Sequence, residues 1–227
     1  MRAILLCAGK GTRLRPLTNY TPKCLMPIKG KPLLEIWLQK LSAVGVDKFL
    51  INTHHLSEKV YDFVNFSKYK KSIEVVYEKK LLGTAGTLNK NISFFKNKDG
   101  IFLHADNYTH DNLKNFIKFH KYRPKRCVIS MMTFETNNPS SCGIIKKNKE
   151  NIVTNFYEKK NKNYGNEANG AIYILSKEFQ KNFRKKFSNT YDFTKDIIAP
   201  MKNDMAAYKT NKIFVDIGSV ANYKLVK

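Results

Sequence analysis

Apolar runs alternate with amphipathic segments over the first half of the chain. Ala3 to Ala8 is an unbroken apolar run, which suits a strand covered on both faces. In the segment that follows Pro32, apolar residues recur at i, i+3, i+4 and i+7, the spacing of one apolar helix face. This alternation predicts a Rossmann-like α/β fold, a mostly parallel sheet with helices on both faces. The further strands are expected at 48–52, 73–77 and 101–106, and the helices at 32–45, 57–66, 86–95 and 111–122.

The pattern changes in the second half of the chain. After an apolar run at 127–134 come short segments of alternating exposure, which predict a small mixed β extension. We therefore expect one domain made of two halves, residues 1–125 and 126–227. The short β runs lie at 143–147, 152–158 and 168–175, two helices are expected at 176–185 and 192–201, and a last strand at 212–217.

Composition adds an unusually high positive charge to this picture. The 227 residues carry 41 Lys and Arg against 18 Asp and Glu, a net charge of +23. A nucleic-acid binder would fit that sum, but the lysines are spread in short clusters without aromatic interleaving. The four cysteines lack C-x-x-C spacing, which argues against a zinc site and a disulfide framework. No apolar run reaches membrane-spanning length, so we expect a soluble, cytoplasmic protein.

A glycine-rich basic loop follows the first apolar run. Gly9 and Gly11 flank Lys10, and Arg13 and Lys23 come soon after. Glycines after a strand let backbone N–H groups approach a phosphate, and basic side chains supply counter-charge. The loop lacks the third glycine of the dinucleotide fingerprint and the G-K-[ST] ending of the Walker A loop. The loop therefore indicates phosphate binding of another kind, with a solvated glycine turn as the simpler alternative.

The complete string resembles a known family signature. Residues 9–23 match G-x-G-T-R-x-x-P-x-T…P-K, the N-terminal motif of the sugar-1-phosphate nucleotidyltransferases. This resemblance implies transfer of a nucleotidyl group to a sugar 1-phosphate with release of pyrophosphate. It implies that Arg13 and Lys23 are catalytic. It also implies that the nucleotide is bound by Leu6, Ala8, Gly9, Gly11, Thr12, Arg13 and Lys23.

A second motif, E-x-x-x-L-G-T-A-G at residues 78–86, resembles the part of the family that lies against the base and ribose. It adds Gly83, Thr84 and Gly86 to the implied nucleotide-binding residues. Its G-T-A-G form is most similar to the guanylyl-transferring, GDP-mannose pyrophosphorylase-like members. GTP with a hexose or heptose 1-phosphate, for surface glycan biosynthesis, is thus the first expectation, and UTP, dTTP and CTP are the alternatives.

Asp106 ends the apolar run at 101–106. Ligands of parallel sheets gather at the carboxyl ends of strands, so Asp106 is placed to face a cleft, although a turn or cap role is the simpler alternative. By the resemblance, Asp106 and Asp216, in V-D-I-G, hold Mg²⁺. His104 departs from the residues usual before that acid and receives no role.

The second half resembles the sugar-binding half of the family, in the strings SCGIIKKN, FYEKK and ANGAIYIL. The resemblance implies that Gly143 lets the sugar approach the backbone, that Glu158 and Asn169 contact the sugar, and that Lys159 holds its phosphate. Without the resemblance, Glu158 and Lys159 would be an ordinary exposed pair. No repeat of a C-terminal β-helix follows these strings.

The predicted partners are a nucleoside triphosphate and a sugar 1-phosphate, with Mg²⁺ as cofactor. No specific nucleic acid and no membrane are expected, and homo-oligomerisation is left open. The alternative from another class is a non-catalytic nucleotide- or nucleic-acid-binding protein.

Overall fold

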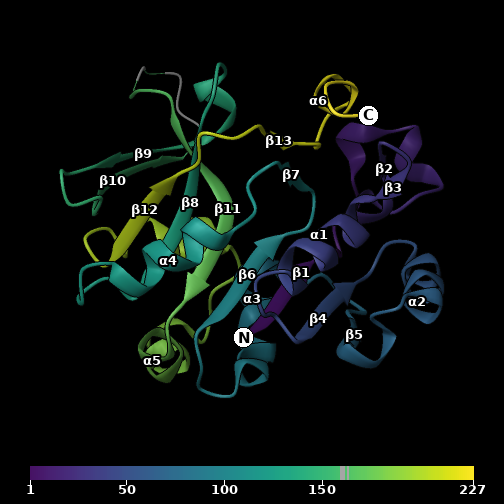
Figure 1. Cartoon of the computed structure of the whole chain (residues 1–227), viewed down its shortest axis with the longest axis horizontal. Helices are drawn as coiled ribbons and strands as arrows, with labels where there is room; N and C mark the ends of the chain where they lie inside the picture. The colour runs from purple at the N-terminus through teal and green to yellow at the C-terminus, as the bar shows by residue number, and fades with distance from the viewer. Residues whose placement is uncertain (159–161, 163) are drawn as a thin grey trace. The chain divides into compact units, whose positions relative to one another are not determined.

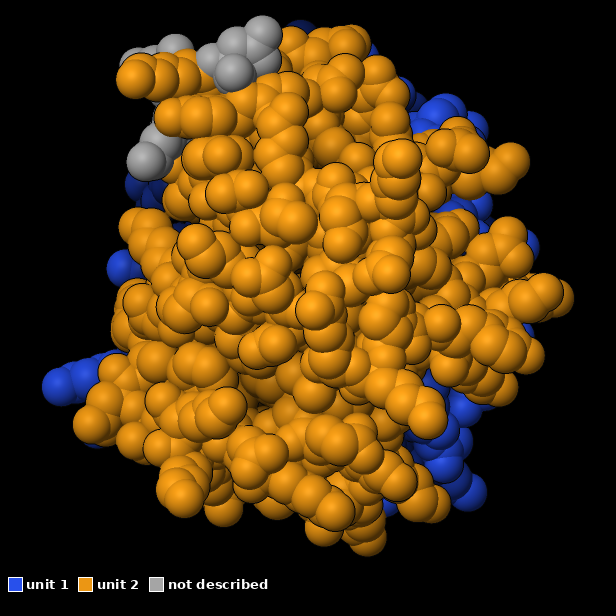
Figure 2. All heavy atoms as spheres, turned by 90° about the vertical axis from the view of Figure 1, so that its left-hand side faces the viewer, with its two compact units in different colours: residues 1–81, 102–112, 213–227 blue, residues 82–101, 113–212 orange. Residues whose placement is uncertain are grey.

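The computed structural model describes residues 1–158, 162 and 164–227. Its residue contacts divide it into two compact units (Figure 2). Unit 1 comprises residues 1–81, 102–112 and 213–227, and unit 2 comprises residues 82–101 and 113–212. The expected halves, 1–125 and 126–227, remain a prediction. Among the described residues, no helix is both long and apolar enough to cross a lipid bilayer.

The sheet of unit 1 is parallel and has the predicted strands (Figure 1). β1 (Arg2–Leu6) pairs in parallel with β4 (Lys48–Thr53), which pairs in parallel with β5 (Ile73–Tyr77). β6 (Gly100–His104) is the neighbour of β1 on its other side. Ile4 and Leu5 are fully buried, as an apolar run covered on both faces requires.

Two helices connect these strands. α1 (Leu33–Ser42) buries Leu34, Trp37, Leu38 and Leu41, the four residues at helical spacing. α2 (Ser57–Phe66) begins where predicted, and Ser57 is its first residue. The N-cap is Leu56, in a left-handed conformation and without a side-chain hydrogen bond. A small hairpin of β2 (Pro27–Ile28) and β3 (Lys31–Pro32) precedes α1.

A second pair of strands in unit 1 joins two distant parts of the sequence. β7 (Asn107–Thr109) pairs antiparallel with β13 (Phe214–Asp216), so that Asn107 faces Asp216. The short helix α6 (Val220–Lys224) follows, and the Ser219 hydroxyl caps it by accepting from the Asn222 N–H at 3.2 Å. This pairing determines where the two predicted metal-binding acids lie.

Unit 2 contains the predicted mixed β structure. β8 (Ile129–Glu135) pairs antiparallel with β11 (Glu167–Leu175) and parallel with β12 (Met205–Lys209). β9 (Gly143–Lys147) pairs antiparallel with β10 (Val153–Glu158). A single register pair, Ala168 with Ile144, connects β9 to β11. Among the described residues, the chain forms no β-helix after these strands.

The helices of unit 2 differ from the predicted ranges at their ends. α3 (Gly83–Asn91) starts earlier, and α5 (Lys177–Phe187) is capped by the Ser176 hydroxyl, which accepts from the Phe179 N–H. α4 (Lys114–Tyr122) starts later than Asp111, because Leu113 takes a left-handed conformation before it. The helix predicted at 192–201 is a π-helical turn, Phe193–Ile198.

Candidate active site

Three charged side chains that are far apart in the sequence converge in unit 1. Asp106 lies in the turn after β6, and Asp216 ends β13 beside it. The Ile217 N–H donates to the Asp106 carbonyl oxygen at 3.1 Å, which holds the two segments together. Lys23 Nζ donates to Asp106 Oδ2 and, at 3.4 Å, to Asp216 Oδ1. The structure thus brings one predicted catalytic residue to both predicted metal ligands.

The turn after β13 positions Asp216. The Gly218 N–H donates to Asp216 Oδ1 at 2.8 Å, and Asn222 Nδ2 donates to the Asp216 carbonyl oxygen at 2.9 Å. A Cβ on Gly218 would lie 2.9 Å from both Asp216 carboxylate oxygens and 2.8 Å from Arg13 Nη2. Only glycine therefore fits there without a shift of these groups. Neither Gly218 nor Asn222 was identified from the sequence, although the V-D-I-G string contains the glycine.

Burial and charge oppose each other in this cluster. The Lys23 side chain is 11% exposed, and this burial by itself lowers the pKa of its ammonium group. The negative charges of Asp106 and then Asp216 together have the larger effect, so the pKa of Lys23 is raised overall. Burial also pushes the pKa of Asp106 upwards, yet Lys23, followed by His104, holds it below its usual value. Lys23 and Asp106 are therefore both charged at neutral pH.

These carboxylates fit a magnesium ion. Asp106 is 29% exposed and Asp216 is 43% exposed, so ligands from solvent can reach both. Mg²⁺ prefers oxygen ligands and typically binds one or two protein carboxylates, with waters and phosphates completing its shell. Among the described residues there is no cluster of three or more His, Cys, Asp and Glu that could hold a metal. Asp106 and Asp216 would hold the ion here, and the other ligands would be water and substrate.

The basic loop lies in the same unit and is held by a threonine. Gly11 has φ +62°, and a Cβ on it would lie 2.8 Å from Thr18 Cγ2. The Thr18 hydroxyl donates to the Gly11 carbonyl oxygen at 2.7 Å. Thr12 and Arg13 begin a 3-10 turn, and the Arg13 guanidinium, 71% exposed, lies 3.8 Å from Asp216. A Cβ on Gly9 would meet no atom within 4 Å, so its backbone is open to close approach.

A buried polar network supports the start of the loop. Leu6 ends β1, and Ala8 is buried. Between them, the Cys7 N–H donates to Asn52 Oδ1 at 2.8 Å, and Asn52 Nδ2 donates to Glu78 Oε1 at 3.0 Å. Glu78 is the first residue of the second motif, and no pattern in the sequence indicates that it supports the first motif.

The G-T-A-G turn lies in unit 2 and is braced by the segment before the π-helical turn. Gly83 has φ +74°, and a Cβ on it would lie 2.3 Å from the Tyr191 carbonyl oxygen. The Thr84 hydroxyl oxygen accepts from the Phe193 N–H at 2.7 Å. Gly86 lies in the first turn of α3. The Thr84 side chain thus connects the G-T-A-G turn to Phe193, a structural role in addition to the predicted nucleotide binding.

The predicted sugar-binding residues that are described also lie in unit 2. Gly143 opens β9 and pairs with Glu158 at the end of β10. A Cβ on Gly143 would lie 2.5 Å from Phe156 Cζ and 2.9 Å from Glu158 Oε2. Asn169 lies in β11, next to the residue that pairs with β9. Lys159 lies outside the described residues.

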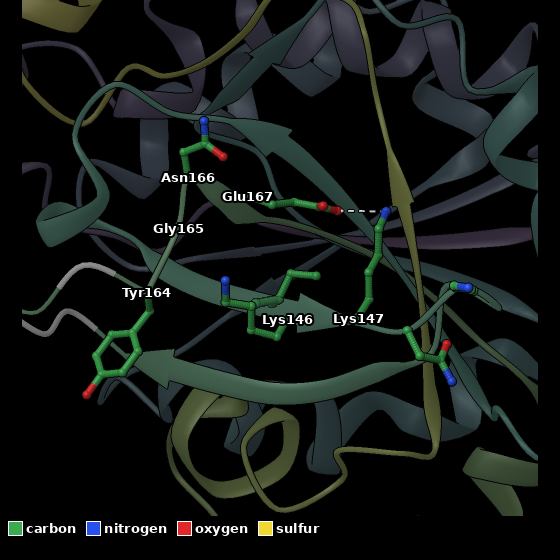
Figure 3. Close-up of a pocket in the computed structure, with 9 residues that line it drawn as sticks. Lys146, Lys147, Tyr164, Gly165, Asn166 and Glu167 are labelled. Carbon is green, nitrogen blue, oxygen red and sulfur yellow. Dashed lines mark ion pairs between the residues drawn. The ribbon is translucent and has the colours of Figure 1, made fainter.

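A separate pocket of about 420 Å³ opens in unit 2 (Figure 3). Lys147 and Glu167 form an ion pair of 2.9 Å in its wall. None of the residues predicted from the sequence is among its described lining residues, so it adds nothing to the candidate site. The lining residues are Ile145, Lys146, Lys147, Asn148, Lys149, Tyr164, Gly165, Asn166 and Glu167.

Comparisons with known proteins agree with this fold. The family model described as "Nucleotidyl transferase" matches residues 2–226. The chain is 27% identical over 225 residues to a D-glycero-alpha-D-manno-heptose 1-phosphate guanylyltransferase of Campylobacter jejuni, covering 98% of this chain and 97% of the relative. It is 28% identical over 241 residues to a UTP–glucose-1-phosphate uridylyltransferase of Synechocystis, covering 98% of this chain and 61% of the relative.

The crystal structure of HddC from Yersinia pseudotuberculosis, complexed with GMP-PN, has the same fold. Its TM-score is 0.80 at 22% identity, covering 99% of this chain and 97% of that chain. The predicted α/β class is thereby confirmed. The present chain spans only about 40% to 61% of the length of several other curated relatives.

Proposed function

Because this chain belongs to the nucleotidyl transferase family, we propose that it transfers a nucleotidyl group from a nucleoside triphosphate to a sugar 1-phosphate and releases pyrophosphate. The observation that carries this proposal is the convergence of Lys23, Asp106 and Asp216. A cation between two partly exposed carboxylates supplies what this reaction needs, namely charges of both signs that can hold phosphate groups and a metal ion.

The proposed reaction requires no nucleophile from the protein. An oxygen of the sugar 1-phosphate, already anionic at neutral pH, forms a bond to the α-phosphorus as the bond to the departing pyrophosphate breaks. The chain must align two anions that repel each other and neutralise the charge of the transition state. Arg13 and Lys23 do this for the triphosphate. Enzymes of the family are generally divalent-metal dependent, and Mg²⁺ held by Asp106 and Asp216 would supply further positive charge at the phosphates.

The residues of unit 2 are assigned to the two substrates by the same proposal. Gly143 leaves room for the sugar beside the backbone, Glu158 accepts hydrogen bonds from sugar hydroxyls, Asn169 contacts the sugar and Lys159 holds its phosphate. Gly143 supports this assignment, because a side chain there would displace Glu158. The glycines of the G-T-A-G turn bind the base and ribose.

We propose guanine as the base. The G-T-A-G form of residues 83–86 supports this assignment, as does the named activity of the Campylobacter relative, which matches along almost its whole length. The Synechocystis relative is named as a uridylyltransferase, so UTP is the first alternative, followed by dTTP and CTP.

A substrate matrix tests the proposal directly. Pyrophosphate release is measured with each of GTP, UTP, dTTP and CTP against a panel of hexose and heptose 1-phosphates in the presence of Mg²⁺. We expect release only when both substrates are present, and the fastest release with GTP. Absence of release with every pair would overturn the enzymatic proposal.

The net charge of +23 favours one other candidate, a non-catalytic nucleotide- or nucleic-acid-binding protein. Non-specific binding to DNA by a basic surface collapses between about 50 and 200 mM salt, because it depends on counterion release. Sequence-selective binding that survives 200 mM salt, in a protein that releases no pyrophosphate, would support this candidate instead.

A further inference from the structure

The side-chain amide of Asn169 is held by a buried tyrosine of the same strand. Asn169 Nδ2 donates to the Tyr173 hydroxyl oxygen at 2.7 Å, and that hydroxyl lies within donating distance of Asn169 Oδ1, at 3.0 Å. Tyr173 is fully buried, whereas Asn169 is half-buried. A half-buried amide is therefore anchored to a fully buried side chain.

A backbone hydrogen bond determines which way the amide faces. The Ala171 N–H, which can only donate, donates to Asn169 Oδ1 at 2.9 Å, so the oxygen must lie on that side. The nitrogen carries two hydrogens, and Tyr173 accepts one of them. Among the described residues, no partner takes the other, which leaves Asn169 with one N–H to offer.

An irregularity in β11 makes this arrangement possible. Asn169 pairs with Thr133 and Tyr173 pairs with Met131, so four steps along β11 match only two along β8. Ala171, inside the irregular segment, has φ +50°. The inserted residues bring Asn169 and Tyr173 to hydrogen-bonding distance, and strand irregularities of this kind commonly re-aim side chains beside functional sites.

The ring of Tyr173 connects this amide to the G-T-A-G turn. It packs on the Phe193 ring, with the centroids 4.9 Å apart. The Phe193 N–H donates to the Thr84 hydroxyl oxygen at 2.7 Å, and the Ala85 N–H donates to the Tyr191 carbonyl oxygen at 3.0 Å. A continuous series of contacts within unit 2 thus runs from Asn169 to Thr84.

We propose that Tyr173 is a positioning residue for both substrates: its hydroxyl aims one N–H of Asn169 at the sugar, and its ring steadies the turn that binds the base. This inference rests on the function proposed above and adds a constraint on the sugar. The sugar atom that meets Asn169 must accept a hydrogen bond, so a sugar hydroxyl or ring oxygen fits there, whereas an ammonium group does not.

Removal of the hydroxyl alone is the first test. Tyr173→Phe keeps the ring on Phe193 and removes the partner of the Asn169 amide nitrogen, so that only the Ala171 N–H still holds the amide, through Oδ1. We expect the KM for the sugar 1-phosphate to rise about 3- to 10-fold, the effect of losing one neutral hydrogen bond, with kcat and the KM for GTP unchanged. Tyr173→Leu, which also removes the ring, should raise both KM values.

The matched control is Tyr223→Phe. Tyr223 is also buried, and its hydroxyl donates to the Pro27 carbonyl oxygen at 2.7 Å, whereas among the described residues it makes no hydrogen bond to a proposed ligand-binding residue. This variant should lose a similar amount of thermal stability without a change in either KM. A rise in the sugar KM of equal size in the control would show that Tyr173 acts only through stability, and it would overturn the inference.

A double-mutant cycle tests whether Tyr173 acts through Asn169. If it does, Tyr173→Phe should have no further effect on the sugar KM in an Asn169→Ala background, and two effects that simply multiply would overturn the inference. The side-chain amide resonance of Asn169, followed by NMR in the free protein, should also move towards a solvent-exposed position in Tyr173→Phe. A wild-type protein that releases no pyrophosphate would overturn the proposed function itself, whereas an active one whose sugar KM is unmoved by Tyr173→Phe would overturn this inference alone.

Discussion

Replacement of Lys23 should lower the stability of the folded protein, so the charge cluster of Lys23, Asp106 and Asp216 can be tested without a substrate. The Lys23 ammonium donates to both Asp106 and Asp216 and neutralises part of their repulsion. Lys23→Met keeps most of the volume of the side chain and removes its charge. The two carboxylates then keep only the exposed Arg13 guanidinium, 3.8 Å from Asp216, as a neighbouring cation, so the protein without Mg²⁺ should become less stable.

The size of the expected loss of stability depends on how deeply Lys23, Asp106 and Asp216 are buried. Removing one partner of a fully buried ion pair costs about 3–5 kcal/mol, but solvent reaches both carboxylates here and screens them. We therefore expect a loss of about 1–2 kcal/mol, which is roughly 2–8 °C in Tm for a chain of this length. The catalytic effect should be larger, a decrease of about 10²- to 10³-fold in kcat, the scale for losing one preorganised electrostatic group.

Thermal unfolding with and without Mg²⁺ is the assay. A ligand that binds only the folded state raises Tm, and carboxylates without their lysine should gain more from Mg²⁺ than the wild type does. Lys59→Met, which removes an exposed lysine of α2, is the control and should change neither value. The reasoning is refuted if Lys23→Met matches the wild type both in metal-free Tm and in the rise caused by Mg²⁺.

Three other outcomes are expected. GTP with Mg²⁺ should raise Tm more than equal concentrations of UTP, CTP or dTTP do, and a larger shift with UTP or dTTP would reverse the choice of base. Gly143→Ala should raise the KM for the sugar 1-phosphate about 10-fold and leave that for GTP unchanged, because the new methyl group would displace Phe156 and Glu158; equal KM values in both proteins would remove Gly143 from the sugar site. Burial lowers the pKa of His120 even though Asp99 lies 3.3 Å away, so the folded state takes up a proton less readily than the unfolded chain. Urea unfolding should therefore show stability falling as the pH drops below about 6.5, the pKa of an unperturbed histidine, and His120→Gln should flatten that decline.

The sequence predicted the parallel strands of unit 1 well, because their signal is local. The apolar run that begins at Ala3 and the spacing of Trp37 and Leu38 depend only on neighbouring residues, and both appear in the structure as expected. Helix starts were harder to predict. Leu56 and Leu113 adopt left-handed conformations before their helices, which the propensities of leucine do not predict.

The residues of the candidate site also fall into two groups, those that sequence motifs indicated and those that they did not. The strings around Lys23, Asp106 and Asp216 marked these residues in the sequence, but only the pairing of β7 with β13 shows that the two acids lie side by side. The supporting groups carried no such signal. Gly218 lies beside Arg13 only in the folded chain, and Tyr173 reaches Asn169 only through the irregularity in β11, which no pattern along the sequence indicates.

The central claim, that Asp106 and Asp216 act together at one metal ion during nucleotidyl transfer, is tested most directly by a double-mutant cycle in pyrophosphate release. Asp106→Asn, Asp216→Asn and the double variant are compared with the wild type across a range of Mg²⁺ concentrations. Residues that act as a unit give non-additive losses, because one missing carboxylate already displaces what the other would hold. The account predicts that each single variant loses most of its activity and that the double variant is little worse than either. Losses that multiply independently, or an Asp216→Asn protein that stays active at low Mg²⁺, would contradict it.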